Sequence, residues 1–302
     1  MELEEPISKN NFVILITSVI IWGLSFPALK VSLSEVQPLT LGLMRMILGA
    51  IPLSIFAIWR VGLNELKLSF KRGWAPISAI AITQFYLPLI AQNVGMNLMD
   101  PKSAASLSSI LQATSPIFAI FFSSLFLGEY IGKKKAFGTA LGLSGTILLV
   151  TRGGIVLSGT NFYGNLLLLF SAIVYAYSGI IAKKALSDND PFIMITIGML
   201  IGTLLFLPTS LYFESLVHLN HISITTWMVV LFLGLFSNGI AMVFWFVVLR
   251  TTQLSKQTLF TYLIPLFGVV FSSLFIGEVI GAETILFGMI TIAGVIIAQY
   301  GH

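Results

Sequence analysis

The feature that most constrains this chain is a series of long apolar stretches separated by short polar ones. A charged side chain at the centre of a bilayer costs about 2.5–3.5 kcal/mol, so charged residues mark where each stretch ends. The ten resulting stretches are residues 12–31, 39–60, 75–99, 103–127, 134–151, 161–182, 191–213, 225–249, 254–276 and 281–300. Most approach the roughly 20 residues that an α-helix needs to cross a membrane. The sequence therefore predicts an all-α integral membrane protein with ten transmembrane helices, whose most polar connections are 62–73 and 214–223.

The composition leaves no room for a soluble catalytic domain. Hydrophobic residues make up 57% of the 302-residue chain and charged residues 9%, whereas globular domains carry about 25% charged residues. The absence of cysteine excludes thiol catalysis and cysteine-based metal sites. The only histidines are His218, His221 and His302, and there is no Walker A, His-Glu-x-x-His or Gly-x-Ser-x-Gly pattern. We therefore expect no enzyme activity, no catalytic residues, no metal and no cofactor.

Basic residues predict the orientation, because Lys and Arg concentrate in cytoplasmic loops. If the N-terminus is cytoplasmic, twelve of the 16 basic residues fall on the cytoplasmic side, Lys30, Lys102 and Arg152 fall outside, and Arg45 lies within a stretch. An even number of spans then places both termini in the cytoplasm, in the plasma (inner) membrane. The acidic start of the chain lacks the basic region of a cleaved signal peptide. Because the basic runs are explained by topology, no nucleic-acid partner is expected.

The chain also contains an internal repeat. The segment SPIFAIFFSSLFLGEYIG (115–132) aligns with IPLFGVVFSSLFIGEVIG (264–281) at an offset of 149 residues. Further upstream, WGLSFPALK (22–30) aligns less closely with YAYSGIIAK (175–183). The alignment predicts two homologous halves of five helices each.

An odd number of helices in each half has a consequence for topology. The two halves, residues 1–152 and 153–302, must enter the membrane from opposite sides and would form inverted repeats. Many secondary transporters have this architecture, with the substrate site near the middle of the membrane between the repeats. The repeat therefore favours a transporter over a receptor or a membrane enzyme.

Three motifs carry a resemblance to a known family. The first stretch contains WGLSFPALK, the second begins with Pro38-Leu39-Thr40 and continues to Arg45, and the pattern Pro…SSLF(L/I)GE…Gly occurs twice. These motifs resemble the EamA family of the drug/metabolite transporter (DMT) superfamily over nearly the whole chain. The resemblance implies ten spans with cytoplasmic termini, a peripheral fifth and tenth span, and a central cavity among the other eight. It also implies transport of amino acids, nucleotide precursors, cofactors or other small metabolites.

Polar side chains inside the apolar stretches are candidates for a binding site, because polar groups in hydrocarbon must be paired or must line water. In the third stretch, Gln84 and Gln92 are eight residues apart, which places them on one helix face, and Asn93 extends the neighbouring face. Amides both donate and accept hydrogen bonds and so suit zwitterions or hydroxyl-bearing metabolites. The alternative role is hydrogen bonding between helices.

The fourth and ninth stretches carry matching residues. Gln112 and Thr261 occupy equivalent positions, and Tyr262 adds a hydroxyl beside Thr261. Pro116 and Pro265 each free the carbonyl four residues earlier from its helical hydrogen bond. We expect both prolines to act as hinges or helix kinks, and ligand binding by the freed carbonyls is the alternative.

Aromatic residues supply the next candidates. Trp22 and Phe26 are four residues apart in the first stretch, and Tyr175 occupies the position of Trp22 in the second half. Trp245 and Asn238 lie two turns apart in the eighth stretch. Such aromatics often serve in packing or as interface anchors, but these lie well inside their stretches, and we expect them to face the cavity.

Ionisable residues bear on the mechanism. Arg45 is the one ionised side chain within a stretch, and it either binds a substrate carboxylate or backbone carbonyls, or extends to the outer interface. No acid lies clearly within a stretch, and Glu129 and Glu278 at stretch ends are expected to be structural caps. Proton-driven carriers commonly use a membrane-embedded carboxylate. We therefore expect weak or no proton coupling.

These observations favour a secondary transporter, and more specifically an exporter of small polar metabolites such as amino acids that works by alternating access. One alternative is an uptake or exchange carrier for nucleotide-like or phosphorylated metabolites, although Arg45 stands nearly alone as a cation. An integral-membrane enzyme would have to use His218, His221 and Glu214. The expected partners are a small-molecule substrate and membrane lipid, and the expected state is a monomer or a weak homodimer.

Overall fold

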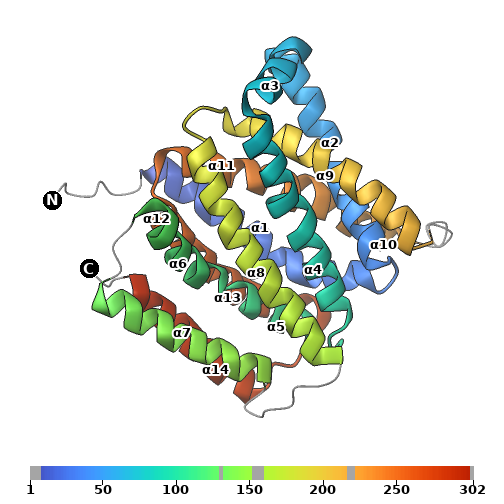
Figure 1. Ribbon diagram of the computed structural model, residues 1–302. Helices are drawn as coiled ribbons and strands as arrows, with labels where there is room; N and C mark the ends of the chain where they lie inside the picture. Colours follow the sequence, from blue (N-terminus) through green and yellow to red (C-terminus); the bar gives the residue numbers. More distant parts are fainter. Residues whose placement is uncertain (1–7, 129–131, 152–159, 216–221, 300–302) are drawn as a thin grey trace.

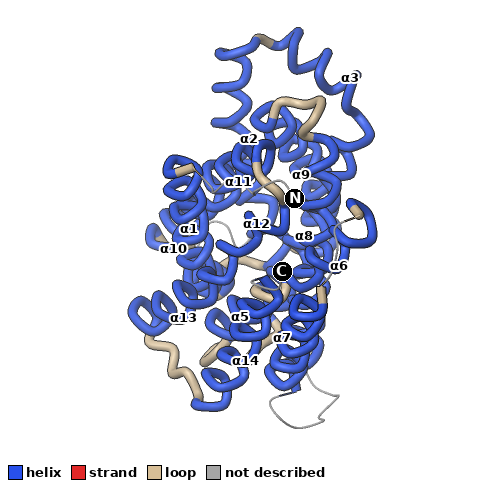
Figure 2. Tube along the Cα trace, turned by 90° about the vertical axis from the view of Figure 1, so that its left-hand side faces the viewer, coloured by secondary structure: helices blue, strands red, loops and turns tan. Residues whose placement is uncertain are grey.

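The computed structural model describes residues 8–128, 132–151, 160–215 and 222–299, shown in Figure 1. Every regular element within these residues is a helix, as Figure 2 shows. Seven helical stretches among them are long and apolar enough to cross a membrane: Lys9–Leu33, Pro38–Val61, Leu63–Asn97, Ala104–Leu127, Thr160–Ala185, Pro191–Phe213 and Ile224–Thr251. Phe260–Ile276 and Ala282–Gly294 are shorter apolar helices. The prediction of an all-helical fold of the membrane type is confirmed.

A helix or a run of consecutive helices lies over each apolar stretch of the sequence. The elements are α1 (Lys9–Leu33), α2 (Pro38–Val61), α3 (Leu63–Ile80), η1 (Ala81–Tyr86), α4 (Leu87–Asn97), α5 (Ala104–Gln112), α6 (Ser115–Leu127), α7 (Lys133–Thr151), α8 (Thr160–Ala185), α9 (Pro191–Phe213), α10 (Ile224–Phe232), η3 (Leu233–Ile240), α11 (Ala241–Thr251), α12 (Leu254–Gln257), η4 (Thr258–Tyr262), α13 (Leu263–Ile276) and α14 (Ala282–Gln299). The segments η1 and η3 are π-helical, and η4 is a 3₁₀-helix.

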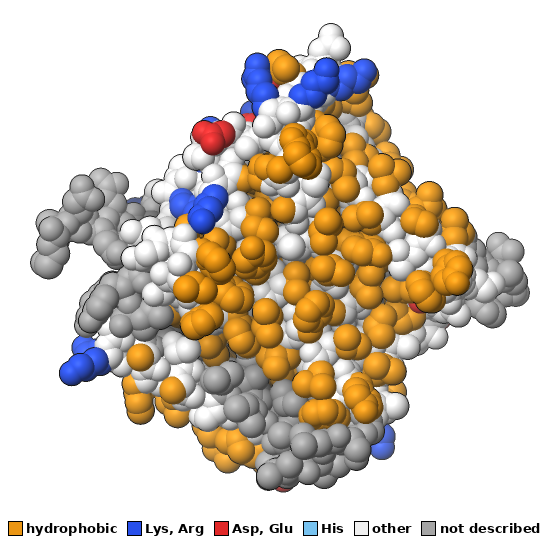
Figure 3. Space-filling view, in the orientation of Figure 1, with side chains coloured by type: hydrophobic (Ala, Val, Ile, Leu, Met, Phe, Trp, Pro, Cys, Tyr) orange, Lys and Arg blue, Asp and Glu red, His pale blue; other side chains and the backbone are white. Residues whose placement is uncertain are grey.

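The polar segment 62–73 is helical rather than a plain connection. Gly62, with a φ of 82°, ends α2 and lets the chain turn, and α3 begins at the next residue. Glu65 in the first turn of α3 suits the positive end of the helix dipole. The helix bends at Gly73, where φ is −114° and ψ is 25°. The ends of α2 and α3 form one extremity of the molecule (Figure 1), and basic side chains gather there (Figure 3).

Apolar side chains cover much of the outer surface, as Figure 3 shows for one face. Trp59, Leu204 and Leu274 are 80%, 68% and 72% exposed, and many other large apolar residues are exposed as well. Contiguous apolar area of this extent is rare on soluble proteins and marks contact with protein or membrane. The outside of the helical bundle is therefore suited to lipid.

The helices α7 and α14 lie side by side along one edge of the molecule (Figure 1). A Cβ atom added at Gly294 would overlap the backbone of Gly142, and one at Gly145 would lie 2.6 Å from the Thr291 nitrogen. Small residues allow such close approach of helices in membranes. Because α7 and α14 pack mainly on each other, the remaining helices form the centre of the fold.

Helices from opposite ends of the chain pack together in this centre. The helix α1 lies against α11 and α13, and α2 lies against α9 and η3. Where α1 meets α13, a Cβ atom added at Gly23 would overlap the Phe267 side chain and lie 3.3 Å from the Gly268 nitrogen. A Cβ atom at Gly268 would in turn lie 2.5 Å from the Ser109 side chain of α5. Glycine at these positions therefore allows α1, α5 and α13 to approach one another closely.

Acidic side chains connect helix ends that are distant in sequence. Glu214, directly after α9, accepts hydrogen bonds from the backbone N–H groups of Leu39 (2.8 Å) and Thr40 (2.6 Å) at the start of α2. These N–H groups lack acceptors within the helix, so a carboxylate stabilises them. Glu35 accepts from the N–H and hydroxyl groups of Ser223 at 2.7 and 2.9 Å. The backbone hydrogen bond is the main reason that the pKa of Glu35 is lowered.

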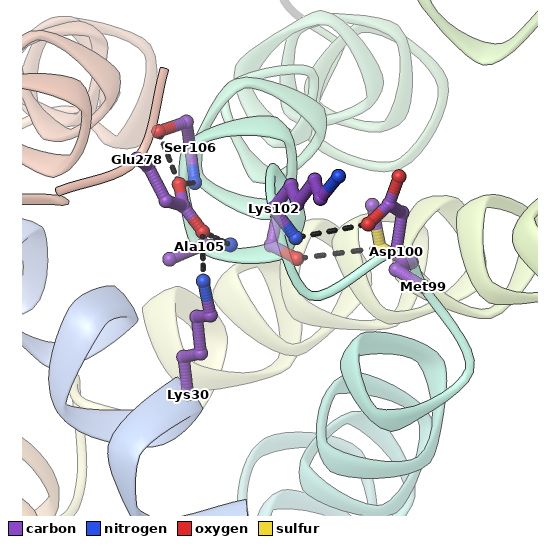
Figure 4. Close-up of polar contacts among 8 residues, drawn as sticks. Lys30, Met99, Asp100, Lys102, Ala105, Ser106 and Glu278 are labelled. Atoms are coloured by element: carbon purple, nitrogen blue, oxygen red, sulfur yellow. Dashed lines mark hydrogen bonds and ion pairs between the residues drawn. The ribbon is translucent and has the colours of Figure 1, made fainter. Parts of the chain in front are cut away.

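Glu278 makes a third connection of this kind (Figure 4). Its carboxylate accepts hydrogen bonds from the N–H groups of Ala105 (3.0 Å) and Ser106 (2.8 Å) and from the Ser106 hydroxyl (2.5 Å), all at the start of α5. It also forms an ion pair with Lys30 near the end of α1, at 3.0 Å. Glu278 thus caps a helix distant in sequence, whereas the cap predicted at Glu129 lies outside the described residues.

Candidate substrate-binding site

A cavity of about 150 Å³ lies among the central helices. Its walls come from α1, α2, α4, α5, α6, α8, α11, α12 and α13 and from the irregular segments η1, η3 and η4. Ten of the twelve candidate binding residues line it: Trp22, Phe26, Arg45, Gln84, Gln92, Gln112, Tyr175, Asn238, Trp245 and Thr261. Residues on helices that are distant in sequence are therefore brought together around one cavity.

Two π-helical segments position the amides of the cavity. Gln84 lies in η1 and Asn238 in η3, and both segments continue directly into α-helices on either side. A π turn holds one more residue than an α turn, is rare, and occurs frequently at functional sites. The Gln84 amide donates to the Met242 sulfur at 3.4 Å. This contact links η1 to α11 across the cavity.

Arg45 faces the interior of the protein and does not extend to the interface. Its side chain is 3% exposed. Nη1 donates to Asn93 Oδ1 at 3.2 Å, and Nη2 donates to Asn238 Oδ1 at 2.8 Å. Asn93, which does not line the cavity, also donates to the Pro38 carbonyl at 3.0 Å. Asn93 therefore helps to orient the Arg45 guanidinium without lining the cavity itself. The two hydrogen bonds of Arg45 link α2 to both α4 and η3.

The aromatic wall is formed mainly by two tryptophans. The rings of Trp22 and Trp245 are 5.3 Å apart between centroids and tilted by 59°. Trp22 Nε1 donates to the Ser237 carbonyl at 3.1 Å, and the Trp245 carbonyl accepts from Gln257 at 2.7 Å. Tyr175 of α8 lines the cavity as well. The Trp22 ring is therefore oriented by a hydrogen bond, and the two rings together form an apolar surface of the cavity.

Gln112 belongs to a chain of hydrogen bonds at the end of α5. Its Nε2 donates to the Ser171 hydroxyl at 2.9 Å, and that hydroxyl donates to the Pro88 carbonyl at 2.9 Å. Thr261, the matching residue in η4, donates to the Thr258 carbonyl at 2.7 Å. Both side chains thus line the cavity, and both belong to hydrogen bonds that end on a backbone carbonyl group.

Tyr262 and the two prolines lie away from the cavity wall. Tyr262 is buried against Ile117, and its hydroxyl has no hydrogen-bond partner in the part of the chain that the structure describes. Pro116 lies in the first turn of α6, just after the break that separates α6 from α5. Pro265 lies in the first turn of α13, which follows η4. Both prolines therefore mark interruptions of helix, and their role as hinges stays a prediction.

Several cavity residues were not among the candidates. Ser25 lies three residues after Trp22, so helical spacing contained a signal for it. Ser237 adjoins Asn238 but lies in η3, where an α-helical period does not apply. Ser115 and Met242 carry no sequence signal, because only the break before α6 and the contact with Gln84 explain their positions.

The described residues contain no group of three His, Asp or Glu side chains that could hold a metal ion. Glu214 caps α2, while His218, His221 and His302 lie outside the described residues. The described residues that line the cavity present amides, aromatic rings and one guanidinium.

Comparison with known proteins identifies the family. Residues 11–151 and 162–300 each match the EamA-like transporter family. The chain belongs to this family. With its long apolar helices, this EamA-like protein is a multi-pass membrane protein. Both matched regions contribute residues to the cavity.

Individual relatives of the EamA-like protein are similar over their whole length. An uncharacterized transporter of Archaeoglobus fulgidus is 26% identical, over 95% of this chain and 96% of the relative. A probable amino-acid metabolite efflux pump of Salmonella typhimurium is 27% identical, over 97% and 95%, and a pump of the same name from Escherichia coli is 26% identical, over 97% and 96%. One solved crystal structure shares the fold with a TM-score of 0.72 and 17% identity, over 96% of each chain.

Proposed function

We propose that this EamA-like protein is a secondary transporter that exports small polar metabolites such as amino acids. The observation that carries the proposal is the cavity, in which three glutamine amides, aromatic rings and Arg45 converge from helices of both family matches. Ligand sites typically combine an apolar lining with a few placed polar groups. An amino acid or a similar metabolite offers both kinds of group.

The proposed architecture is ten spans in two inverted five-helix repeats, residues 1–152 and 153–302. The double family match supports it, as does the position of η1 in the third apolar stretch and η3 in the eighth. Rocking of two such repeats about the cavity would give alternating access. The distribution of basic residues supports an inner-membrane protein with both termini in the cytoplasm. Because helices of one chain line the cavity, we propose that a monomer suffices.

Two further observations support the substrate class and the weak coupling. The Salmonella typhimurium and Escherichia coli relatives are named as amino-acid metabolite efflux pumps. None of the described residues lining the cavity is Asp or Glu. An embedded carboxylate is a common device of proton-driven carriers, so its absence from this wall supports facilitated export or exchange.

Counterflow in liposomes tests the proposal. Purified protein would be reconstituted and loaded with amino acids, with their oxidised or acylated derivatives, or with phosphorylated metabolites. We expect protein-dependent exchange of an amino acid or a derivative, with little change when a proton gradient is collapsed. Exchange of phosphorylated metabolites alone would favour the alternative carrier class, and the absence of exchange for every compound would contradict the proposal.

Trp22→Ala should lower this flux about tenfold with unchanged expression. The substitution removes one of the two rings of the aromatic wall and the hydrogen bond to the Ser237 carbonyl, and a loss of about 1.4 kcal/mol corresponds to a factor of ten. Trp59→Ala is the matched control, because Trp59 is 80% exposed on the outer surface. Equal flux in both variants would remove Trp22 from the binding site.

A further inference from the structure

Arg45 presents more hydrogen-bond donors than the protein satisfies. A guanidinium carries five N–H groups. Among the described residues, the hydrogen bonds to Asn93 and Asn238 use two of them, and Nε is buried without a partner. With 3% exposure, the side chain lies on the cavity wall and away from bulk water. Nε does not face the cavity, but the second N–H group of Nη1 and of Nη2 is available to a ligand there.

The positive charge of Arg45 also lacks a counter-ion. Among the described residues, no Asp or Glu forms an ion pair with Arg45. The two amide oxygens that accept from Arg45 are neutral. An ionised group that is buried without compensating charge is costly. The cavity thus favours a ligand that brings one negative charge.

The geometry points to a ligand with one carboxylate, held by Arg45, and an apolar body that contacts Trp22 and Trp245. This inference rests on the proposed transport function and specifies its substrate class. Paired N–H groups of arginine match a carboxylate, and the tryptophan rings provide the apolar surface beside it. The described wall offers no carboxylate to an ammonium group. Carboxylates without a free ammonium, such as 2-oxo acids and N-acyl amino acids, therefore fit better than the matching amino acids.

A series of leucine derivatives tests this expected order of affinities on the unmodified protein. Binding of N-acetyl-leucine, 4-methyl-2-oxopentanoate, leucine and leucinamide in nanodiscs would be followed by tryptophan fluorescence, which none of these compounds disturbs by emission of its own. We expect the two anions to bind at least threefold more tightly than leucine and about a hundredfold more tightly than leucinamide. Leucinamide within threefold of the anions, or no binding by any of the three carboxylates, would overturn the inference.

Variants at residue 45 then test whether Arg45 causes the preference for anions over the amide. Arg45→Gln should reduce the ratio of anion to amide affinity to below threefold, and Arg45→Lys should retain the preference with weaker binding. Arg72→Gln is the matched control, because Arg72 is exposed on α3. An Arg45→Gln protein that folds and keeps the hundredfold ratio would overturn the assignment. If Arg45→Gln fails to fold, the comparison of the four compounds on the unmodified protein decides the inference alone.

Two controls distinguish carboxylate recognition from general anion binding and from transport. Chloride at the concentration of the ligand should not compete, and complete displacement of N-acetyl-leucine by equimolar chloride would show a general anion site and overturn carboxylate recognition. Flux is measured separately in liposomes with the same compounds. Binding in the expected order without flux would leave the inference standing and contradict the proposed transport function, whereas flux of leucinamide equal to that of the anions would contradict the inference alone.

Discussion

Glu278→Gln should destabilise the protein by about 3 kcal/mol, the lower end of the roughly 3–5 kcal/mol that follows removal of one partner of a buried ion pair, because Lys30 is partly exposed. The Glu278 side chain is 0% exposed, and Lys30, at 23%, would keep its charge without a partner. The new amide would also direct a donor NH₂ group toward the start of α5, where the N–H groups of Ala105 and Ser106 now donate to the carboxylate. The ends of α1 and α5 would therefore both lose a stabilising contact.

Unfolding in detergent, followed by tryptophan fluorescence, measures this effect. Glu283→Gln is the matched control, because Glu283 is an exposed acid in the first turn of α14, five residues from Glu278. The double variant Lys30→Gln with Glu278→Gln should recover part of the loss, since no unpaired charge remains. A Glu278→Gln protein as stable as the Glu283→Gln protein would show that the connection between α1 and α5 contributes nothing to stability.

Gly23→Val should prevent correct packing of α1 on α13. The new Cβ would overlap the Phe267 side chain and approach the Ile264 carbonyl oxygen to 3.3 Å, and helix backbone cannot yield as a flexible side chain does. Overpacking of this kind typically costs about 1–3 kcal/mol. Because Trp22 adjoins Gly23, a shift of α1 would also displace the aromatic wall, and we expect flux to fall more than stability.

The yield of monodisperse protein, its unfolding temperature and its flux are the measurements for Gly23→Val. Gly281→Val serves as the control, since a Cβ atom at Gly281 meets nothing within 4 Å and its φ is not in the left-handed region. Comparable yield and flux for the two variants would mean that α1 and α13 separate more easily than their contact implies.

The helices themselves could be predicted from the sequence because one simple force dominates. A charge in hydrocarbon is so costly that the apolar stretches have little choice but to form helices. The same reasoning was wrong for residues 62–73. Their polar side chains predicted a connection between helices, whereas in the structure most of them belong to the amphipathic helix α3. Polarity indicates where a chain leaves the membrane interior, but it does not indicate where the helix ends.

Ten of the candidate residues line the cavity, but the contacts among them could not be predicted from the sequence. Buried polar side chains such as Gln84 and Gln112 stand out in an apolar stretch, and both line the cavity. Asn93 carries the same signal, yet it lies behind Arg45 because α2 and α4 meet there. The pairing of Glu278 with the start of α5 joins residues more than 170 positions apart. Contacts of this range depend on tertiary packing, which helical periodicity alone does not contain.

The π-helical segment η1 places Gln84 without changing the direction in which α4 faces. A π turn holds one more residue than an α turn, so deletion of one residue between Ala81 and Tyr86 would convert η1 into an α-helical turn with little rotation of α4 relative to α3. Gln92 would keep its place on the cavity wall, whereas Gln84, inside the segment, would be displaced. The extra residue of η1 therefore matters for one amide of the cavity and not for the helices on either side.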